Sequence, residues 1–138
     1  SDKDCKALRE FGINIGIGFQ LKDDLLDVYA DQSHFGKQVG GDIIANKKTL
    51  LLIEALQLAK GNSKKKLLDW ISKENFKPEE KIKEVLSIYN SLNVQSIAEE
   101  KMNEYFQKGL NQLSILGASK DKVTMLKSFT QNLINRES

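Results

Sequence analysis

The chain has 138 residues, of which 21 are basic and 19 acidic, so its net charge is only +2. This length fits one domain or part of one, and the near balance of charge does not suggest nucleic-acid binding. A single cysteine, Cys5, excludes a disulfide framework and a cysteine metal site, so we expect a reducing, cytoplasmic location. No apolar run approaches the roughly 20 residues that a transmembrane helix needs.

The hydrophobic pattern predicts an all-α protein. The chain has one proline and no sustained alternation of apolar and polar residues. A first helix is expected from about 4 to 30, and its middle, residues 11–19, is apolar nearly all round, as in a buried central helix. Gly12 and Gly16 would let a neighbouring backbone come close there, although they would also fit a helix break.

A loop is expected over residues 31–46, because glycines punctuate it. Thr49 would cap the next helix, Gly61 would close it and Pro78 fits a first turn. Because the chain lacks an initiator methionine and starts within a helical pattern, we expect a piece of a longer protein, a single all-α fragment over 1–138. About six helices are predicted in all, at residues 4–30, 50–60, 63–73, 78–92, 93–117 and 120–136.

Three carboxylates, Asp23, Asp24 and Asp27, follow the apolar run of the first helix. A helix places Asp23 and Asp27 on one face and Asp24 about 100° round the turn. Acids held so closely repel one another, and their oxygens suit Mg²⁺ or another hard cation. Short acidic clusters are also common at solvated helix ends. An EF-hand is excluded, because its alternating oxygen ligands and mid-loop glycine are missing.

Lysines follow these acids at Lys37 and Lys47, with Asp42 between them and Asn46 beside the second. A lysine is a mobile point charge suited to phosphate, and Mg²⁺ binds one or two protein acids together with phosphate oxygens. Either lysine alone would be interpreted as a surface residue. Together with the acids, the two lysines predict a magnesium–diphosphate site.

The joint pattern resembles the second aspartate-rich region of the trans-isoprenyl diphosphate synthases, the family of farnesyl, geranylgeranyl and longer polyprenyl diphosphate synthases. The resemblance covers essentially the whole chain but is sharp only from Gly18 to Thr49, where the ordered spacing is far more specific than a lone acidic motif. The pattern reads Phe19-Gln20-x-x-Asp23-Asp24-x-x-Asp27, then Gly36-Lys37-x-x-Gly40-Gly41-Asp42-Ile43, then Asn46-Lys47-x-Thr49.

The resemblance implies the C-terminal portion of an isoprenoid-synthase-type helical bundle. It implies a homodimeric prenyltransferase that condenses isopentenyl diphosphate with an allylic diphosphate, head to tail, by Mg²⁺-assisted ionisation. The roles that it implies are Mg²⁺ ligation by Asp23 and Asp27 with Asp24 supporting, diphosphate contacts by Lys37 and Lys47, a substrate contact by Gln20, and orientation of the loop or its lysine by Asp42.

The chain departs from the family pattern in two respects. It carries no first aspartate-rich motif, since Asp69 and Asp121 are isolated, and it lacks the upstream basic residues that the family needs for the homoallylic substrate. We therefore expect it to supply half of the diphosphate site and to be inactive alone. A non-catalytic regulatory subunit of a heteromeric synthase is the alternative, and a terpene cyclase, whose second metal motif usually has an Asn/Ser/Glu pattern, ranks below it. Because helices 4–30 and 50–60 have more apolar surface than the trailing helices cover, self-association is expected.

Overall fold

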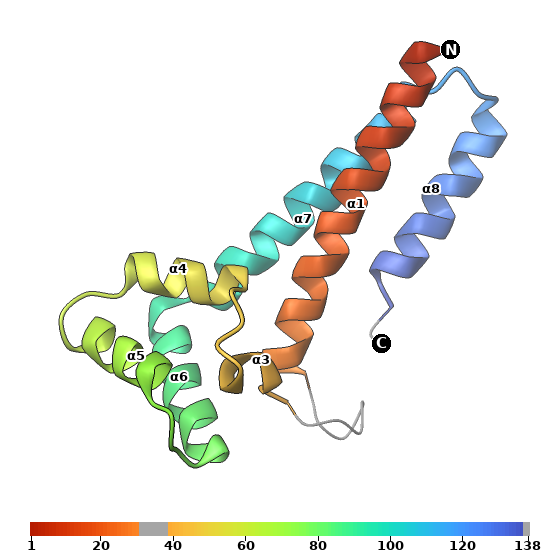
Figure 1. Cartoon of the computed structure of the whole chain (residues 1–138). Helices are drawn as coiled ribbons and strands as arrows, with labels where there is room; N and C mark the ends of the chain where they lie inside the picture. Colours follow the sequence, from red (N-terminus) through yellow and green to blue (C-terminus); the bar gives the residue numbers. More distant parts are fainter. Residues whose placement is uncertain (31–38, 137–138) are drawn as a thin grey trace. The chain divides into compact units, whose positions relative to one another are not determined.

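The structure is a computed structural model that describes residues 1–30 and 39–136. Within these ranges every regular element is a helix, which confirms the all-α prediction (Figure 1). None of the helices described is long and apolar enough to cross a membrane. The helices are α1 (Asp2–Tyr29), α3 (Gly41–Ile44), α4 (Leu50–Leu58), α5 (Asn62–Ser72), α6 (Pro78–Leu92), α7 (Val94–Leu113) and α8 (Lys120–Ile134).

The helices divide between two compact units, and the two longest, α1 and α7, contribute to both. The first unit contains Ser1–Gln20 and Glu100–Ser138, and the second contains Leu21–Glu99. Ser1 begins α1 as an N-cap, because its Oγ accepts a hydrogen bond of 3.2 Å from the backbone N–H of Asp4. Asp2 and Asp4 lie in the first turn, where negative charge is favourable.

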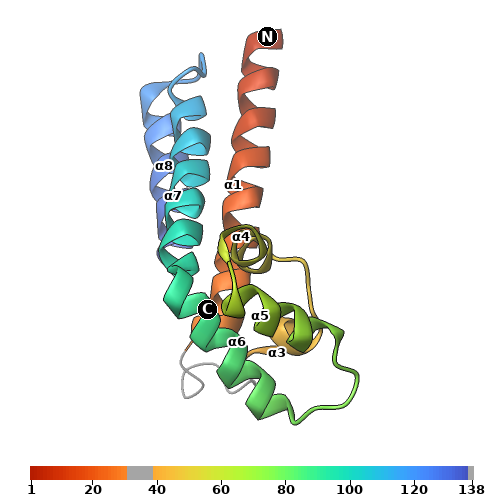
Figure 2. The same cartoon turned by 90° about the vertical axis from the view of Figure 1, so that its left-hand side faces the viewer.

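The first unit has a small apolar core between α1, α7 and α8. Figure 2 shows α7 and α8 side by side. The rings of Phe19 and Phe106 meet edge to face with their centroids 5.3 Å apart, a favourable aromatic geometry. The buried core residues are Ile15, Phe106, Leu110 and Leu113, with Phe11, Met102, Leu116, Val123, Leu126 and Ile134 packed around them.

Close packing between α1 and α7 occurs at glycines, but not at the glycines that the sequence suggested. No other atom of residues 1–30 and 39–136, the backbone of α1 itself aside, lies within 4 Å of the position where a Cβ would stand on Gly12 or Gly16. The expected close approach there is therefore wrong for the described part of this chain. A Cβ on Gly18 would instead overlap the ring of Phe106. On Gly109 it would lie 2.6 Å from Cδ1 of Ile15. The glycines that face the neighbouring helix are therefore Gly18 and Gly109.

The apolar middle of α1 is buried on one face only. Ile15 is 8% exposed, but Ile13 and Ile17 are 49% and 37% exposed. These two residues are four apart and so share a face of the helix. The prediction that residues 11–19 are buried all round is therefore wrong for this chain, which leaves an apolar stripe on its surface.

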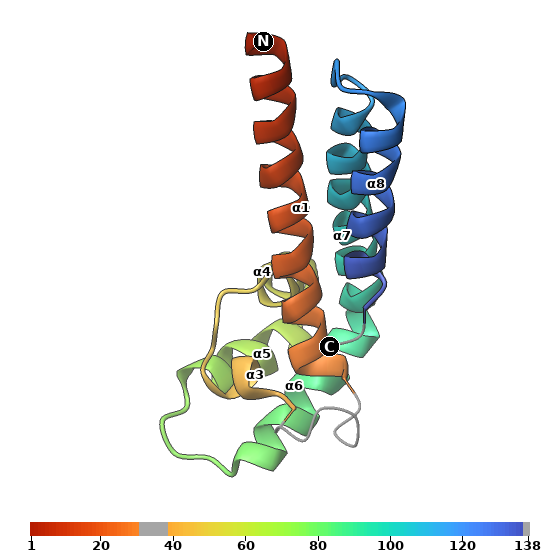
Figure 3. The same ribbon diagram turned by 90° about the vertical axis from the view of Figure 1, so that its right-hand side faces the viewer.

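In the second unit α6 contacts α3, α4 and α5, and Figure 3 shows this group from the side. Pro78 lies in the first turn of α6 as expected, and Thr49 caps α4 by accepting a 3.2 Å hydrogen bond from the N–H of Leu52. The buried apolar residues of this unit include Ile43, Leu51, Leu52, Ala55, Leu67, Trp70, Val85, Ile88 and Tyr89.

Four expected element boundaries differ from the structure. One is the end of α7, which lies at Leu113 rather than at residue 117. The expected loop contains the short helix α3, while residues 31–38 lie outside the described ranges. Gly61 does not close α4, which ends at Leu58, but precedes α5 with φ +59°. Asn93, expected to cap the next helix, is the C-cap of α6 and directly precedes α7. Its φ of +61° is a left-handed conformation that asparagine tolerates better than most residues.

We expect Gly18→Ala to lower the free energy of unfolding by about 1–3 kcal/mol, because the added methyl group must displace the ring of Phe106. Gly16→Ala makes the same change in the same helix at an open position, and it should raise that free energy by about 0.5–1 kcal/mol. Urea unfolding followed by circular dichroism measures both. Equal effects of the two substitutions would contradict the packing described here.

The exposed stripe on α1 leads us to expect that the chain by itself self-associates, because burial of apolar surface is worth about 25 cal/mol per Å². Ile13→Lys combined with Ile17→Lys should lower the average mass measured by light scattering. Gln107→Lys, which adds a charge at an exposed polar position of α7, is the control and should not. A monomer at high concentration of the unmodified chain would refute the expectation.

Candidate functional site

The three acids near the C-terminal end of α1 lie in three different environments. Asp23 is exposed, the side chain of Asp24 is only 8% exposed, and Asp27 is half-buried. Successive helical residues point about 100° apart, which is why neighbours such as Asp23 and Asp24 differ so strongly. The end of α1 therefore presents one carboxylate to solvent and places another inside the protein.

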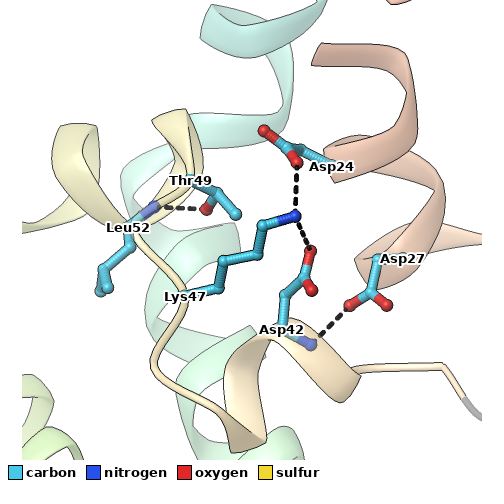
Figure 4. Close-up of polar contacts among 6 residues, drawn as sticks. All are labelled: Asp24, Asp27, Asp42, Lys47, Thr49 and Leu52. Atoms are coloured by element: carbon cyan, nitrogen blue, oxygen red, sulfur yellow. Dashed lines mark hydrogen bonds and ion pairs between the residues drawn. The ribbon is translucent and has the colours of Figure 1, made fainter. Parts of the chain in front are cut away.

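Lys47 lies between two carboxylates of the second unit (Figure 4). Its Nζ is 3.7 Å from Oδ1 of Asp24 and 3.9 Å from Oδ2 of Asp42, while its side chain is 51% exposed. An exposed ion pair stabilises a protein little, but a buried carboxylate without a cation is costly. The ammonium of Lys47 therefore compensates the buried charge of Asp24 and still faces solvent.

Asp27 organises the chain that leads to Asp42. Its Oδ2 accepts a 2.9 Å hydrogen bond from the backbone N–H of Asp42 (Figure 4). Its carbonyl oxygen accepts one of 2.7 Å from the backbone N–H of Gly40. Gly40 has φ +96°, and a Cβ there would lie 2.8 Å from Cδ1 of Ile82, so the position favours glycine. Asp27 thus fixes the start of α3 and the placement of the Asp42 carboxylate.

The backbone of Lys47 is held on both sides. Its N–H donates to the carbonyl of Asp42 over 2.9 Å, and its carbonyl accepts from the N–H of Thr49 over 2.8 Å. Thr49 in turn is buried and caps α4. The Lys47 ammonium can move on its flexible side chain, but the Lys47 backbone is fixed by these hydrogen bonds.

A buried lysine, Lys81, stands behind this segment and was missed by sequence reasoning. Its Nζ donates to Oδ1 of Asn46 over 2.7 Å, and burial lowers the pKa of its ammonium. Lys81 lies four residues before Val85 and so on the apolar face of α6. That placement was the available signal, but a lone lysine in an amphipathic helix usually faces solvent.

Two further predicted site residues are not part of the second unit's described contacts. Lys37 is outside the described residues. Gln20 is exposed on α1 and belongs to the first unit. The structure therefore brings together Asp24, Asp42 and Lys47, with Asp27 bound to the backbone of Asp42.

Within residues 1–30 and 39–136, no three His, Cys, Asp or Glu side chains lie close enough to hold a metal ion. The carboxylate oxygens of Asp23 and Asp27 are nevertheless the kind of donor that Mg²⁺ prefers. Mg²⁺ commonly takes one or two protein carboxylates and completes its shell with water and phosphate oxygens. The acids present fit an ion that is shared with an anionic ligand.

Two tyrosines lie on the inner side of the second unit. The hydroxyl of Tyr29 is buried and has no hydrogen-bond partner among the described residues. Burial, and then the charge of Glu99, raise the pKa of Tyr29 to about 12. Burial also raises the pKa of Tyr89, with smaller contributions from Tyr29 and from Asp42. Both phenols therefore stay protonated through the neutral range.

Two sequence comparisons match this chain to the same kind of protein. A family model described as polyprenyl synthetase matches residues 1–89. A short chain isoprenyl diphosphate synthase of Methanocaldococcus jannaschii is 42% identical over 88 residues, which are 64% of this chain and 27% of that protein.

Solved structures agree over nearly the whole chain. A crystal structure of geranylgeranyl pyrophosphate synthase matches with a TM-score of 0.87 at 30% identity, covering 100% of this chain and 43% of that one. The enzyme of that name from Corynebacterium glutamicum, complexed with isoprenyl diphosphate and magnesium, matches with a TM-score of 0.82 at 27% identity, covering 99% and 38%. The chain thus spans less than half the length of the proteins that it matches.

We expect Tyr29→Phe to leave the free energy of unfolding at pH 7 unchanged or raised by up to about 1 kcal/mol, because it removes a buried hydroxyl without a described partner. The pKa of Tyr29 is higher in the folded than in the unfolded state, where it is about 10. Its contribution to the free energy of unfolding is therefore fully present below about pH 10 and is lost as the pH rises above that value. For Tyr29 this loss extends to about pH 12.

Thermal unfolding between neutral pH and pH 12 measures this loss of stability. Tyr29→Phe should lose less stability than the parent as the pH rises, although the titration of Tyr89 still destabilises both proteins. A variant that is clearly less stable at neutral pH would show that the hydroxyl has a bonding partner.

Proposed function

We propose, because this chain belongs to the polyprenyl synthetase family, that it is the C-terminal part of a trans-prenyltransferase. The complete protein would join isopentenyl diphosphate to an allylic diphosphate, head to tail. The observation that carries the proposal is the half-exposed ammonium of Lys47 between Asp24 and Asp42, beside the helix that bears Asp23. The relative from Corynebacterium glutamicum, complexed with isoprenyl diphosphate and magnesium, supports this class of ligand.

The chain's own residues would bind and orient the diphosphate of the allylic substrate. Lys47 would contact its oxygens, joined by Lys37. Asp24 and Asp42 hold the Lys47 head within ion-pairing distance, so the lysine is oriented before the anion arrives. Gln20, which lies one turn before Asp24 on α1, would contact the substrate. Such pre-orientation lowers the entropy cost of binding and of reaction.

Asp23 and Asp27 would hold Mg²⁺, with Asp24 in a supporting role. Asp23 is exposed and Asp27 half-buried, whereas Asp24 pairs with Lys47, which supports this division of roles. When bound, Mg²⁺ supplies positive charge that neutralises the diphosphate and makes it a better leaving group.

In the proposed reaction the allylic C–O bond breaks and both of its electrons leave with the diphosphate. The double bond of isopentenyl diphosphate then provides the electron pair of the new carbon–carbon bond, and a proton is lost to restore a double bond. Lys47 contributes by stabilising negative charge as it develops on the leaving group. This step requires no nucleophilic side chain.

The chain is much shorter than the synthases that it matches, and this bears on its activity in isolation. It spans 43% of a similar synthase chain, and it carries no second acidic motif of the kind found at Asp23–Asp27. We propose that the other half of the diphosphate site comes from residues outside this sequence and that the 138 residues do not turn over substrate by themselves. A homodimeric state of the complete protein belongs to the same proposal.

No observation favours the alternative of a non-catalytic subunit. The relatives named above are all described as synthases. The two hypotheses differ in the role of Lys47. A catalytic chain needs the charge of Lys47 for turnover, whereas the function of a non-catalytic subunit would not depend on that charge.

In the full-length protein we expect Lys47→Met to lower kcat/KM by about a hundredfold or more, because the leaving diphosphate loses a charged contact. Asp23→Ala should lower turnover by several orders of magnitude through loss of a metal ligand. The assay measures incorporation of isopentenyl diphosphate into a longer prenyl diphosphate. Lys48→Met, which removes an exposed lysine at the next position, is the matched control and should retain turnover.

Near-normal turnover of Asp23→Ala would refute the metal assignment. Similar turnover in the Lys47 and Lys48 variants would refute the role of Lys47.

A further inference from the structure

Lys81 of α6 is among the most deeply buried side chains described, with 1% of its surface exposed. All of its described contacts are with neutral groups. Nζ donates to Oδ1 of Asn46 over 2.7 Å and to the carbonyl of Ile44 over 3.3 Å, and it stands 4.5 Å from the centre of the Phe76 ring. Two of the three N–H donors of the ammonium are thus used in hydrogen bonds, and its charge faces the aromatic ring.

No carboxylate of the described residues lies within ion-pairing distance of Lys81. A buried charge without a counter-ion costs stability, and an apolar side chain of similar shape would fill the same space without that cost. The ammonium does satisfy two acceptors, Oδ1 of Asn46 and the carbonyl of Ile44. Its structural effect is exerted through the groups that it contacts.

The strongest of these contacts is with Asn46, which has φ +54°. This left-handed conformation is unfavourable for most residues and needs support from its surroundings. The side-chain amide of Asn46 is held from both ends, because its Nδ2 donates to the carbonyl of Ile71 over 2.9 Å while Oδ1 accepts from Lys81.

Asn46 is the residue immediately before Lys47, so its conformation sets where the side chain of Lys47 begins. The Lys47 N–H bonds to the carbonyl of Asp42 over 2.9 Å. Asp42, Asn46 and Lys81 also line a single cavity of about 10 Å³, roughly the space of one water. Lys81 thus lies directly behind the segment that carries Lys47.

We propose that Lys81 is a positioning residue for Lys47. By clamping the side chain of Asn46, it holds the left-handed turn from which Lys47 reaches Asp24 and Asp42. Lys81 itself does not touch the ligand. This inference rests on the proposed function, because only there does Lys47 contact diphosphate.

Binding of inorganic diphosphate to the full-length protein in excess Mg²⁺, measured by calorimetry, tests the proposal. Lys81→Met keeps an unbranched apolar side chain and removes the charge. We expect it to weaken binding about tenfold, within the usual range for coupled neighbours, with helical content unchanged. Lys83→Met removes an exposed lysine of the same helix and should bind like the parent.

A double-mutant cycle with Lys47→Met separates positioning from a general structural role. If Lys81 acts through Lys47, Lys81→Met should have no further effect once Lys47 is replaced. The ³¹P resonance of the bound diphosphate should also move in the same direction in both single variants. Additive losses, or a Lys81 variant that loses thermal stability but keeps its affinity, would overturn the proposal.

Two further outcomes are distinguishable. If Lys47→Met leaves diphosphate affinity unchanged, the proposed function fails and the inference fails with it. If Lys47→Met weakens binding but Lys81→Met does not, the inference alone fails. Should Lys81→Met not fold, Asn46→Gly replaces it, since glycine keeps the positive φ and lacks the amide. That variant should show the same loss, and parent-like affinity would refute the clamp.

Discussion

The ammonium of Lys47 lies between two carboxylates that would repel each other in its absence. Asp24 is almost wholly buried, and Asp42 is partly so. A buried carboxylate needs a cation or several hydrogen-bond donors. Lys47, three residues beyond the end of α3, supplies this cation. The end of α1, the short helix α3 and the segment before α4 are therefore tied together by charge.

The hydrogen bonds around this ion-pair group decide how rigid it is. Asp27 binds the N–H of Asp42, so the second carboxylate is fixed by the same helix that carries the first. The backbone of Lys47 is held by Asp42 and Thr49. Only the head of Lys47 and the carboxylate of Asp23 remain well exposed. That combination, a fixed base with exposed charged heads, suits a ligand that carries both phosphate and a divalent cation.

Features that depend on local sequence pattern, such as the helices, could be predicted from the sequence. Features that depend on tertiary contacts could not. Apolar spacing predicted the helices. The spacing of acids and lysines singled out Asp24, Asp42 and Lys47, which the structure brings together, while the roles of the predicted site residues stay predictions. Local pattern could not show which glycine of α1 meets α7, because that depends on where Phe106 packs, so Gly18 was overlooked in favour of Gly12. Nor could it show that Asp27 binds a backbone N–H fifteen residues away, or that Lys81 faces inward.

In the proposed site the acids of α1 and Lys47 bind magnesium diphosphate together. Nuclear magnetic resonance of the isotopically labelled full-length protein, titrated with diphosphate in the presence and absence of Mg²⁺, tests this binding. We predict Mg²⁺-dependent shifts at the carboxyl carbons of Asp23 and Asp27 and a shift at the Lys47 side chain. Saturable binding that leaves these three signals unmoved would contradict it.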